Sequence, residues 1–346
     1  MSSLVSISAA RPGEVNEEFE AHLIRSLPVI VLSPHNRCNC RCMMCDIWRI
    51  QESRNVTPED LQPHISHFRE LGVKWVVFSG GEPQLNPQWP ELAGSLRNQG
   101  IRITILTAGL LLESEAATVA ASVDDLIISL DGPAELHNRI RRVAGAYEKI
   151  AAGISAIREI RPEMPIRARC TVQKANHRSL RETVRTAKEL GLNSISFLAV
   201  DASSSAFNRE SGWPEKQQER VLLNAEEVEH LDYEVEQLIC ECSLELQSGF
   251  VTEKPEKLRK IVRHFRAYLG TEPHIAPRCN APWVSAVIEA SGDVRPCFFH
   301  PSIGNLHRQS LPEILNGQKG LQFRANLNIA NDSTCQKCVC SLYLAR

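Results

Sequence analysis

Cys38, Cys42 and Cys45 follow one another with three and then two residues between them. Their thiolates can bind three irons of a four-iron cluster, which leaves the fourth iron without a protein ligand. Clusters that only carry electrons are usually held by four cysteines. A metal position without a protein ligand is typical of sites where a molecule binds and reacts at the metal. The triplet therefore indicates metal-centred chemistry.

Two features near the triplet leave alternatives open. A zinc site or a redox-inert cluster would need a fourth ligand, and His35 could supply it. Cys40 lies inside the motif at a different spacing, and we expect that it is not a ligand.

A second group of cysteines lies near the end of the chain, at Cys279, Cys297, Cys335 and Cys338. Two cysteine pairs can form a structural tetrahedral zinc site, and four cysteines can also hold an iron–sulfur cluster. Spacing alone does not separate these two interpretations.

Composition narrows the class of protein. The 346 residues carry a net charge of −2, which gives no reason to expect nucleic-acid binding. No apolar stretch approaches the roughly 18 residues of a membrane span, and no export signal is visible at the start. We therefore expect a cytoplasmic protein, in which twelve cysteines indicate metal binding or catalysis more than disulfides.

The elements that must position these cysteines alternate from residue 28 to about residue 200. Short, apolar, β-branched segments predict buried parallel strands. They are 29–32, 75–78, 101–106, 126–130, 166–172 and 194–198, and amphipathic segments at 58–71, 147–160 and 180–190 predict helices between them. Repeats of this kind favour a parallel α/β architecture, either an open sheet or a partial barrel. The first triplet falls in the first strand-to-helix loop, where such folds bind ligands.

Residues 201–275 break this rhythm. A polar loop is followed by an acidic helix at about 225–246 and a basic helix at about 257–269, whose charged faces we interpret as solvated surface and which could pair. We therefore divide the chain into an N-terminal extension (1–27), a core (28–200), a helical linker or insertion (201–275) and a C-terminal module (276–346).

The triplet and the segment Ser79-Gly80-Gly81-Glu82-Pro83 after the second strand resemble the radical S-adenosylmethionine (radical SAM) superfamily. The resemblance implies a partial (β/α)6 TIM-like barrel and a [4Fe–4S] cluster at Cys38, Cys42 and Cys45 that binds SAM. It also implies that Gly80, Gly81 and Glu82 bind the amino end of SAM. Adjacent glycines let the backbone approach a ligand closely, and a carboxylate suits an ammonium group.

The same resemblance implies further SAM contacts, which lie at the ends of later strands. They are Ser129 and Asp131 for the ribose, Arg169 and Asn176 as polar contacts, and Leu198 for the adenine. Relatives commonly have an aromatic residue before the last cysteine of the triplet, where this chain has Met44. A thioether can also pack on a flat ring, so we still expect SAM to bind.

The C-terminal cysteines, together with 292–297, 303–306 and 311–315, resemble the shortened SPASM module called twitch. That resemblance implies one auxiliary [4Fe–4S] cluster held by Cys279, Cys297, Cys335 and Cys338. Cys340 does not have the spacing of the additional cysteines of the full SPASM form, so we expect one auxiliary cluster.

These resemblances imply a radical SAM oxidoreductase. It would cleave SAM reductively and use the 5′-deoxyadenosyl radical to abstract hydrogen from a small molecule, including a sugar-like one, or from a peptide. The auxiliary cluster favours net oxidation; redox-neutral epimerisation or decarboxylation is the alternative, as is an iron–sulfur or zinc protein without turnover. The electron donor would be a flavodoxin or ferredoxin. Asp131, His137, Asp201 and His300 are candidate proton acceptors, but none is favoured over a packing role.

Overall fold

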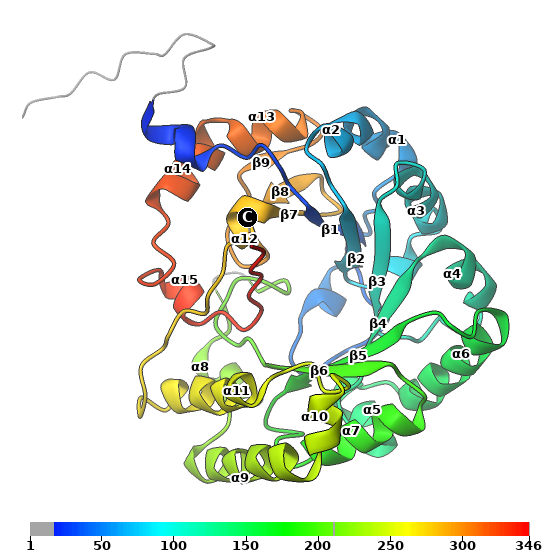
Figure 1. Ribbon diagram of the computed structural model, residues 1–346, viewed down its shortest axis with the longest axis vertical. Coiled ribbons are helices and arrows are strands. Elements are labelled where there is room, and N and C mark those ends of the chain that lie inside the picture. The colour runs from blue at the N-terminus through cyan, green and yellow to red at the C-terminus, as the bar shows by residue number, and fades with distance from the viewer. Residues whose placement is uncertain (1–16, 210–211, 346) are drawn as a thin grey trace, which may run out of the picture.

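The computed structural model describes residues 17–209 and 212–345, and its centre is one curved sheet (Figure 1). The strands lie in the order β6-β5-β4-β3-β2-β1-β7-β8-β9. Their bounds are β1 Val29–His35, β2 Trp75–Gly80, β3 Arg102–Thr107, β4 Asp125–Ser129, β5 Ile166–Val172, β6 Ser194–Ala199, β7 Ser285–Ile288, β8 Asp293–Arg295 and β9 Gly304–Asn305. β1 to β6 are parallel and follow chain order without reversal. This order is that of a partial barrel and not of a doubly wound sheet, which decides between the two predicted architectures.

Helices follow the strands of the core and lie outside the curve of the sheet (Figure 1). They are α1 Pro58–Leu61, α2 Ile65–Glu70, α3 Trp89–Arg97, α4 Ala116–Ser122, α5 Ala134–Arg141, α6 Ala146–Ile160 and α7 Leu180–Glu189. The single helix predicted at 58–71 was wrong in one respect, because a 3-10 turn, η3 (Gln62–His64), divides α1 from α2. Pro63 lies in this turn, and proline has no N–H for a continuous helix.

The C-terminal residues extend the sheet of the core. β7 pairs in parallel with β1, from Val29 opposite Ser285 to Leu32 opposite Ile288. β8 and β9 then add antiparallel strands. The sheet therefore runs unbroken from β6 to β9, and the domain boundary at residue 276 stays a prediction.

Of the four helices in residues 201–275, the acidic and the basic one pair with each other, as the sequence allowed. They are α8 Glu215–Gln218, α9 Ala225–Glu241, α10 Ser243–Gln247 and α11 Pro255–Tyr268. Arg259 of α11 lies 2.7 Å from Glu236 of α9, and Arg266 lies 2.8 Å from Asp232. The acidic and basic faces therefore contact each other as well as solvent.

The remaining helices lie among the C-terminal residues. They are α12 Ala281–Val284, α13 Leu311–Asn316, α14 Gln318–Asn326 and α15 Ser333–Gln336. The turn η1 (Glu17–His22) lies beside α14 (Figure 1), and the buried Arg324 of α14 donates to the carbonyl of His22. Of the predicted N-terminal extension, residues 1–16 lie outside the described residues. No helix in the described ranges has the length and apolar character to cross a membrane.

Candidate metal and cofactor site

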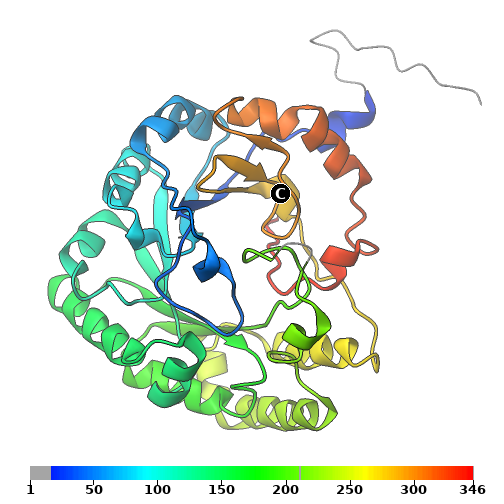
Figure 2. The same cartoon turned by 180° about the vertical axis from the view of Figure 1, so that it is seen from behind.

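The loop after β1 contains the first cysteine triplet and lies inside the curve of the sheet (Figure 2). Two glycines at the end of β2 hold the start of this loop. Gly81 N–H donates to the carbonyl of His35, and Glu82 N–H donates to that of Arg37 at 2.8 Å. A Cβ atom on Gly81 would lie 1.9 Å from the carbonyl oxygen of Arg37, and one on Gly80 would lie 2.6 Å from Cβ of Ser33. The lack of a side chain at Gly80 and Gly81 therefore makes room for the backbone of the cysteine loop. The sequence alone did not indicate this role.

The thiols of the loop differ in their protonation. Cys40 is buried and forms hydrogen bonds with Cys38 and Cys42, which raise the pKa of Cys40 far above its ordinary value. The hydrogen bond from Cys40, assisted by the charge of Arg141, lowers the pKa of Cys42 to about 6 despite burial. Burial raises the pKa of Cys45. The shared hydrogen bond therefore favours the ionised form of Cys42 and the protonated form of Cys40. That Cys40 is not a ligand stays a prediction.

A buried ion pair lies beneath the triplet. Arg141, at the end of α5, lies 2.7 Å from the Asp131 carboxylate and donates to the sulfur of Cys42 at 3.6 Å. The last carbonyls of α5, those of Ile140 and Arg141, accept from the N–H groups of Met43 and Arg41. Nothing in the motifs of the sequence marks Arg141 as a buried residue. Only the hydrophobic period of α5 could have indicated that Arg141 faces inward.

The loop after β6 contacts the triplet from the other side, beside the blue loop in Figure 2. Arg209 donates to the carbonyls of Met44 and Asp201 and pairs with the Asp201 carboxylate at 2.9 Å. Its guanidinium lies 3.9 Å from the ring centroid of Trp213, which donates to Asp46. No sequence signal marked Arg209 or Trp213 as residues that support the cysteine loop.

Glu82 lies buried between the ends of β2 and β3. Its carboxylate accepts from Thr107 Oγ1 at 2.9 Å and from Ala108 N–H at 2.8 Å. Burial outweighs these hydrogen bonds and raises the pKa of Glu82 to about 7. Within the described ranges no basic side chain pairs with it. A cationic ligand would favour the ionised form of Glu82. The role of Glu82 in binding the amino group of SAM stays a prediction.

The other predicted SAM contacts fall into two groups. Ser129, Arg169 and Leu198 are half-buried and lie on β4, β5 and β6, where Ser129 is opposite Arg169. The alternate residues of these strands are fully buried, so the three share the inner face of the barrel. Met44 is buried beside the triplet.

Asp131 and Asn176 are fully buried in hydrogen bonds within the protein. Asp131 accepts from Thr171 N–H and pairs with Arg141, and Asn176 donates to the carbonyls of Asp131 and Thr171. Direct contact with SAM would require these bonds to change, and their roles as SAM contacts stay predictions.

A cavity of ≈ 600 Å³ lies between the core and the C-terminal residues. Ser33, His35, Gly80 and Gly81 line it from the core, and Arg295, Phe298 and Ser302 line it from the C-terminal side. The sequence suggested His35 only as a fourth ligand of a zinc or redox-inert cluster site, but its Nδ1 lies 2.6 Å from Asn55 Oδ1. Of the candidate proton acceptors, Asp131, His137, Asp201 and His300 do not line this cavity.

The C-terminal cysteines line a smaller, largely apolar cavity of ≈ 120 Å³. Cys279, Cys297, Cys335 and Cys338 all contribute, and Cys340 does as well. Burial raises the pKa of Cys297 to about 11 and that of Cys335 to about 12. These thiols ionise only when a positive charge, such as that of a metal, lies among them.

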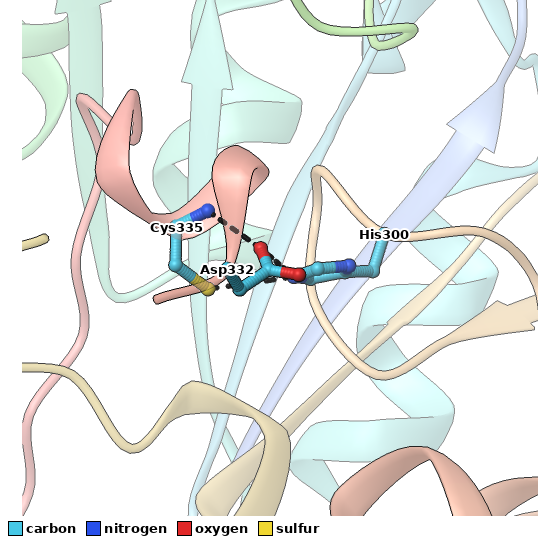
Figure 3. A group of neighbouring side chains, drawn as sticks. All are labelled: His300, Asp332 and Cys335. Atoms are coloured by element: carbon cyan, nitrogen blue, oxygen red, sulfur yellow. Dashed lines mark hydrogen bonds and ion pairs between the residues drawn. The ribbon is translucent and has the colours of Figure 1, made fainter. Parts of the chain in front are cut away.

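Each of the four predicted ligands has a hydrogen-bond donor. The backbone of Ala281 donates to Cys279, those of Phe299 and His300 donate to Cys297, and that of Cys340 donates to Cys338. Cys335 instead lies 3.5 Å from Nε2 of the His300 side chain (Figure 3). Asp332 Oδ1 lies 3.7 Å from the same nitrogen and caps Cys335 N–H. If Cys335 binds a metal as a thiolate it can only accept, and His300 would then donate from Nε2–H to its sulfur.

The distances between the cysteine sulfurs help to distinguish a zinc ion from an iron–sulfur cluster. A tetrahedral zinc with Zn–S bonds of about 2.3 Å holds its sulfurs roughly 3.8 Å apart. Among the described residues, His300, Asp332 and Cys335 are the one group of three donors whose ligating atoms all lie within 4.8 Å. Neither cysteine group is that compact. A four-iron cluster, whose cysteines bind separate irons, fits this wider spacing better than a single zinc ion does.

Comparisons with known proteins agree with this geometry. The sequence family described as the radical SAM superfamily matches residues 32–170, and the iron–sulfur cluster-binding domain SPASM matches residues 279–339. Two relatives come from Methanosarcina barkeri. Fe-coproporphyrin III synthase is 24% identical over 95% of this chain and 86% of its own, and AdoMet-dependent heme synthase is 26% identical over 80% and 78%.

A solved structure has the same fold. Streptococcus suis SuiB, bound to the precursor peptide SuiA, aligns with a TM-score of 0.64 at 14% identity, over 98% of this chain and 80% of SuiB. The domain matches imply a SAM-binding [4Fe–4S] cluster and auxiliary iron–sulfur chemistry at the C-terminal end.

Proposed function

Since the chain is a radical SAM protein with a C-terminal SPASM domain, we propose that it oxidises its substrate by removing two hydrogens. One observation carries this proposal. Val287 and Phe298 line both the large cavity and the smaller cavity of the C-terminal cysteines. A substrate in the large cavity would thus be separated from the auxiliary site by a single layer of side chains.

The residues present fit the two clusters and SAM. We assign Cys38, Cys42 and Cys45 to the SAM-binding cluster and Cys279, Cys297, Cys335 and Cys338 to the auxiliary cluster. When bound, these groups supply a 5′-deoxyadenosyl radical that takes one hydrogen atom from the substrate, and an acceptor for the electron that leaves afterwards. Glu82 binds the amino end of SAM, and Arg141 and Arg209 hold the cysteine loop against the barrel.

Loss of two hydrogens also releases a proton, and we propose that His35 accepts it. Asn55 Oδ1 accepts the hydrogen of His35 Nδ1, which leaves Nε2 as the basic nitrogen. Among the residues that line the large cavity, His35 is the one imidazole. The proton of an alcohol or amide group would pass to Nε2 as the electron leaves the substrate.

The substrate is a small molecule or a peptide. The cavity of ≈ 600 Å³ lies in the range of sites for small ligands. Its lining combines hydroxyl and amide side chains with two ion pairs, Glu52–Arg54 and Glu289–Arg295. This neutral, polar lining suits a molecule rich in hydrogen-bonding groups, such as a sugar-like compound or a peptide segment.

The test removes the auxiliary cluster site and keeps the SAM-binding cluster site. The C335S/C338S variant should still cleave SAM with dithionite, but it should not form a product that has lost two hydrogens. Mass spectrometry of candidate peptides and polyols incubated with both proteins separates the outcomes. A product of unchanged mass, or one that has lost carbon dioxide, from both proteins would instead show redox-neutral epimerisation or decarboxylation.

A further inference from the structure

A small opening exposes the cysteine loop on the side away from the large cavity. It is lined by Cys42, Met43 and Trp48 of the loop and by Trp213 and Gln217 of the segment after β6. The turn η2 (Ile47–Arg49) separates the two spaces. Ile47 faces the large cavity, whereas Trp48 and Arg49 line the opening. The proposed cluster site thus has a substrate side and a second side that reaches the protein surface.

The rim of the opening is positively charged. Arg49, Arg142 and Arg220 line it together with Asp46. Arg49 pairs with Asp46 at 2.7 Å, whereas Arg142 and Arg220 are exposed and pair with no acidic group of the described residues. Glu215 and Glu219 are exposed on and beside α8, but they do not line the opening. Two arginines without an acidic partner among the described residues therefore line the same opening as Cys42.

The rim connects directly to the metal site. Arg142 ends α5 in the left-handed conformation, with φ of 53°, and the preceding Arg141 donates to the Cys42 sulfur. A partner bound at this rim would lie beside a predicted cluster ligand without entering the substrate cavity.

We propose that this arginine-lined opening is the docking site of an acidic one-electron carrier protein. The proposal rests on the proposed function, because the carrier gives up one electron to the site at Cys38, Cys42 and Cys45. No bond or proton is transferred in that step. A positive rim fits an acidic surface and accelerates its encounter at low ionic strength.

The experiment compares the holoenzyme with the R142N/R220Q variant. Asparagine tolerates the left-handed conformation of residue 142, so the change removes charge without straining the backbone. The matched control is R69Q/R185Q, which removes two exposed arginines from α2 and α7. A purified, acidic flavodoxin is the probe, and its binding is measured directly by calorimetry and by its rate of oxidation.

We expect R142N/R220Q to weaken flavodoxin binding and to lower kcat/KM for flavodoxin about tenfold at low salt, with a weaker dependence on salt. The control should behave like the parent protein. SAM cleavage driven by dithionite should be the same in all three proteins, because a small reductant needs no docking surface.

Two results would overturn the proposal. Flavodoxin binding that is unchanged in R142N/R220Q would show that the carrier docks elsewhere. An equal loss of flavodoxin-driven and dithionite-driven cleavage in R142N/R220Q would show that the arginines support the cysteine loop instead. Failure of the proposed function looks different, because the parent protein itself would then not cleave SAM with dithionite.

Discussion

Arg141 Nη1 lies 3.6 Å from the sulfur of Cys42, and the same guanidinium pairs with Asp131 at 2.7 Å. The pair links the first cysteine loop to the ends of β4 and α5. Both side chains are almost fully buried. Burying both ions costs desolvation energy, which their mutual attraction offsets, and the pair holds a positive charge beside a predicted cluster ligand.

Removing only one partner of this pair should destabilise the protein strongly. R141M leaves the Asp131 carboxylate buried without a cation, and we expect a loss of about 3–5 kcal/mol in the free energy of unfolding. The double variant R141M/D131N should recover much of that loss, because neither charge remains. Urea unfolding of the two variants checks this. Equal stability of R141M and the parent protein would show that the pair is not buried as described.

Replacing Gly81 should release the first cluster and spare the second. In G81A the new Cβ would clash with the carbonyl of Arg37, so the cysteine loop must move. We expect the iron content after anaerobic reconstitution to fall from about eight to about four atoms per chain. G94A is the matched control, since a Cβ at Gly94 of α3 meets no atom within 4 Å. Equal iron content in G81A and G94A would contradict this role of Gly81.

Binding of SAM should depend on pH through Glu82. Burial raises the pKa of Glu82 to about 7, so its carboxyl group is mainly neutral below that pH and ionised above it. An ammonium ligand prefers the ionised form. The ratio of Kd for E82Q to Kd for the parent protein should therefore rise between pH 6 and pH 8. Calorimetry with SAM measures this ratio. A ratio that stays constant with pH would show that Glu82 does not bind SAM.

His300 should raise the reduction potential of the auxiliary cluster. With the proton on Nε2, His300 would donate to the Cys335 sulfur at 3.5 Å, and donors to cluster sulfurs stabilise the reduced state. H300F keeps a ring against Phe323 but removes the donor, so we expect the potential to fall by about 59 mV, a tenfold change in the one-electron equilibrium. D332N should shift the potential upward, because it removes a negative charge and keeps a helix-capping side chain. Redox titration followed by electron paramagnetic resonance measures both, and unchanged potentials would limit His300 to packing.

The sequence predicted the elements of the core well, because buried parallel strands and amphipathic helices carry strong hydrophobic patterns. The strand predicted at 166–172 has the bounds of β5, and the others differ at their ends by a few residues. The pairing of β7 with β1 was not predicted. That contact joins residues more than 250 positions apart, and no local pattern reports it.

The site was predicted in part. Motif spacing pointed to the cysteines and to Gly80–Glu82, since these signals are local. Arg141 and Arg209 were missed as supports of the cysteine loop, because arginine usually indicates surface and only the fold shows that they are buried. His35 was assigned no catalytic role, since its position on the cavity depends on how β1, β2 and β7 meet.

The central claim is that one chain holds two clusters and cleaves SAM at the first. Anaerobic reconstitution, with iron, sulfide and zinc analysis and a 5′-deoxyadenosine assay under dithionite, tests it most directly. We predict about eight irons per chain and SAM cleavage for the parent protein, and about four irons without cleavage for C38A/C42A/C45A. Zinc bound in place of iron at the C-terminal cysteines, or a parent protein with full iron content that forms no 5′-deoxyadenosine, would contradict the account.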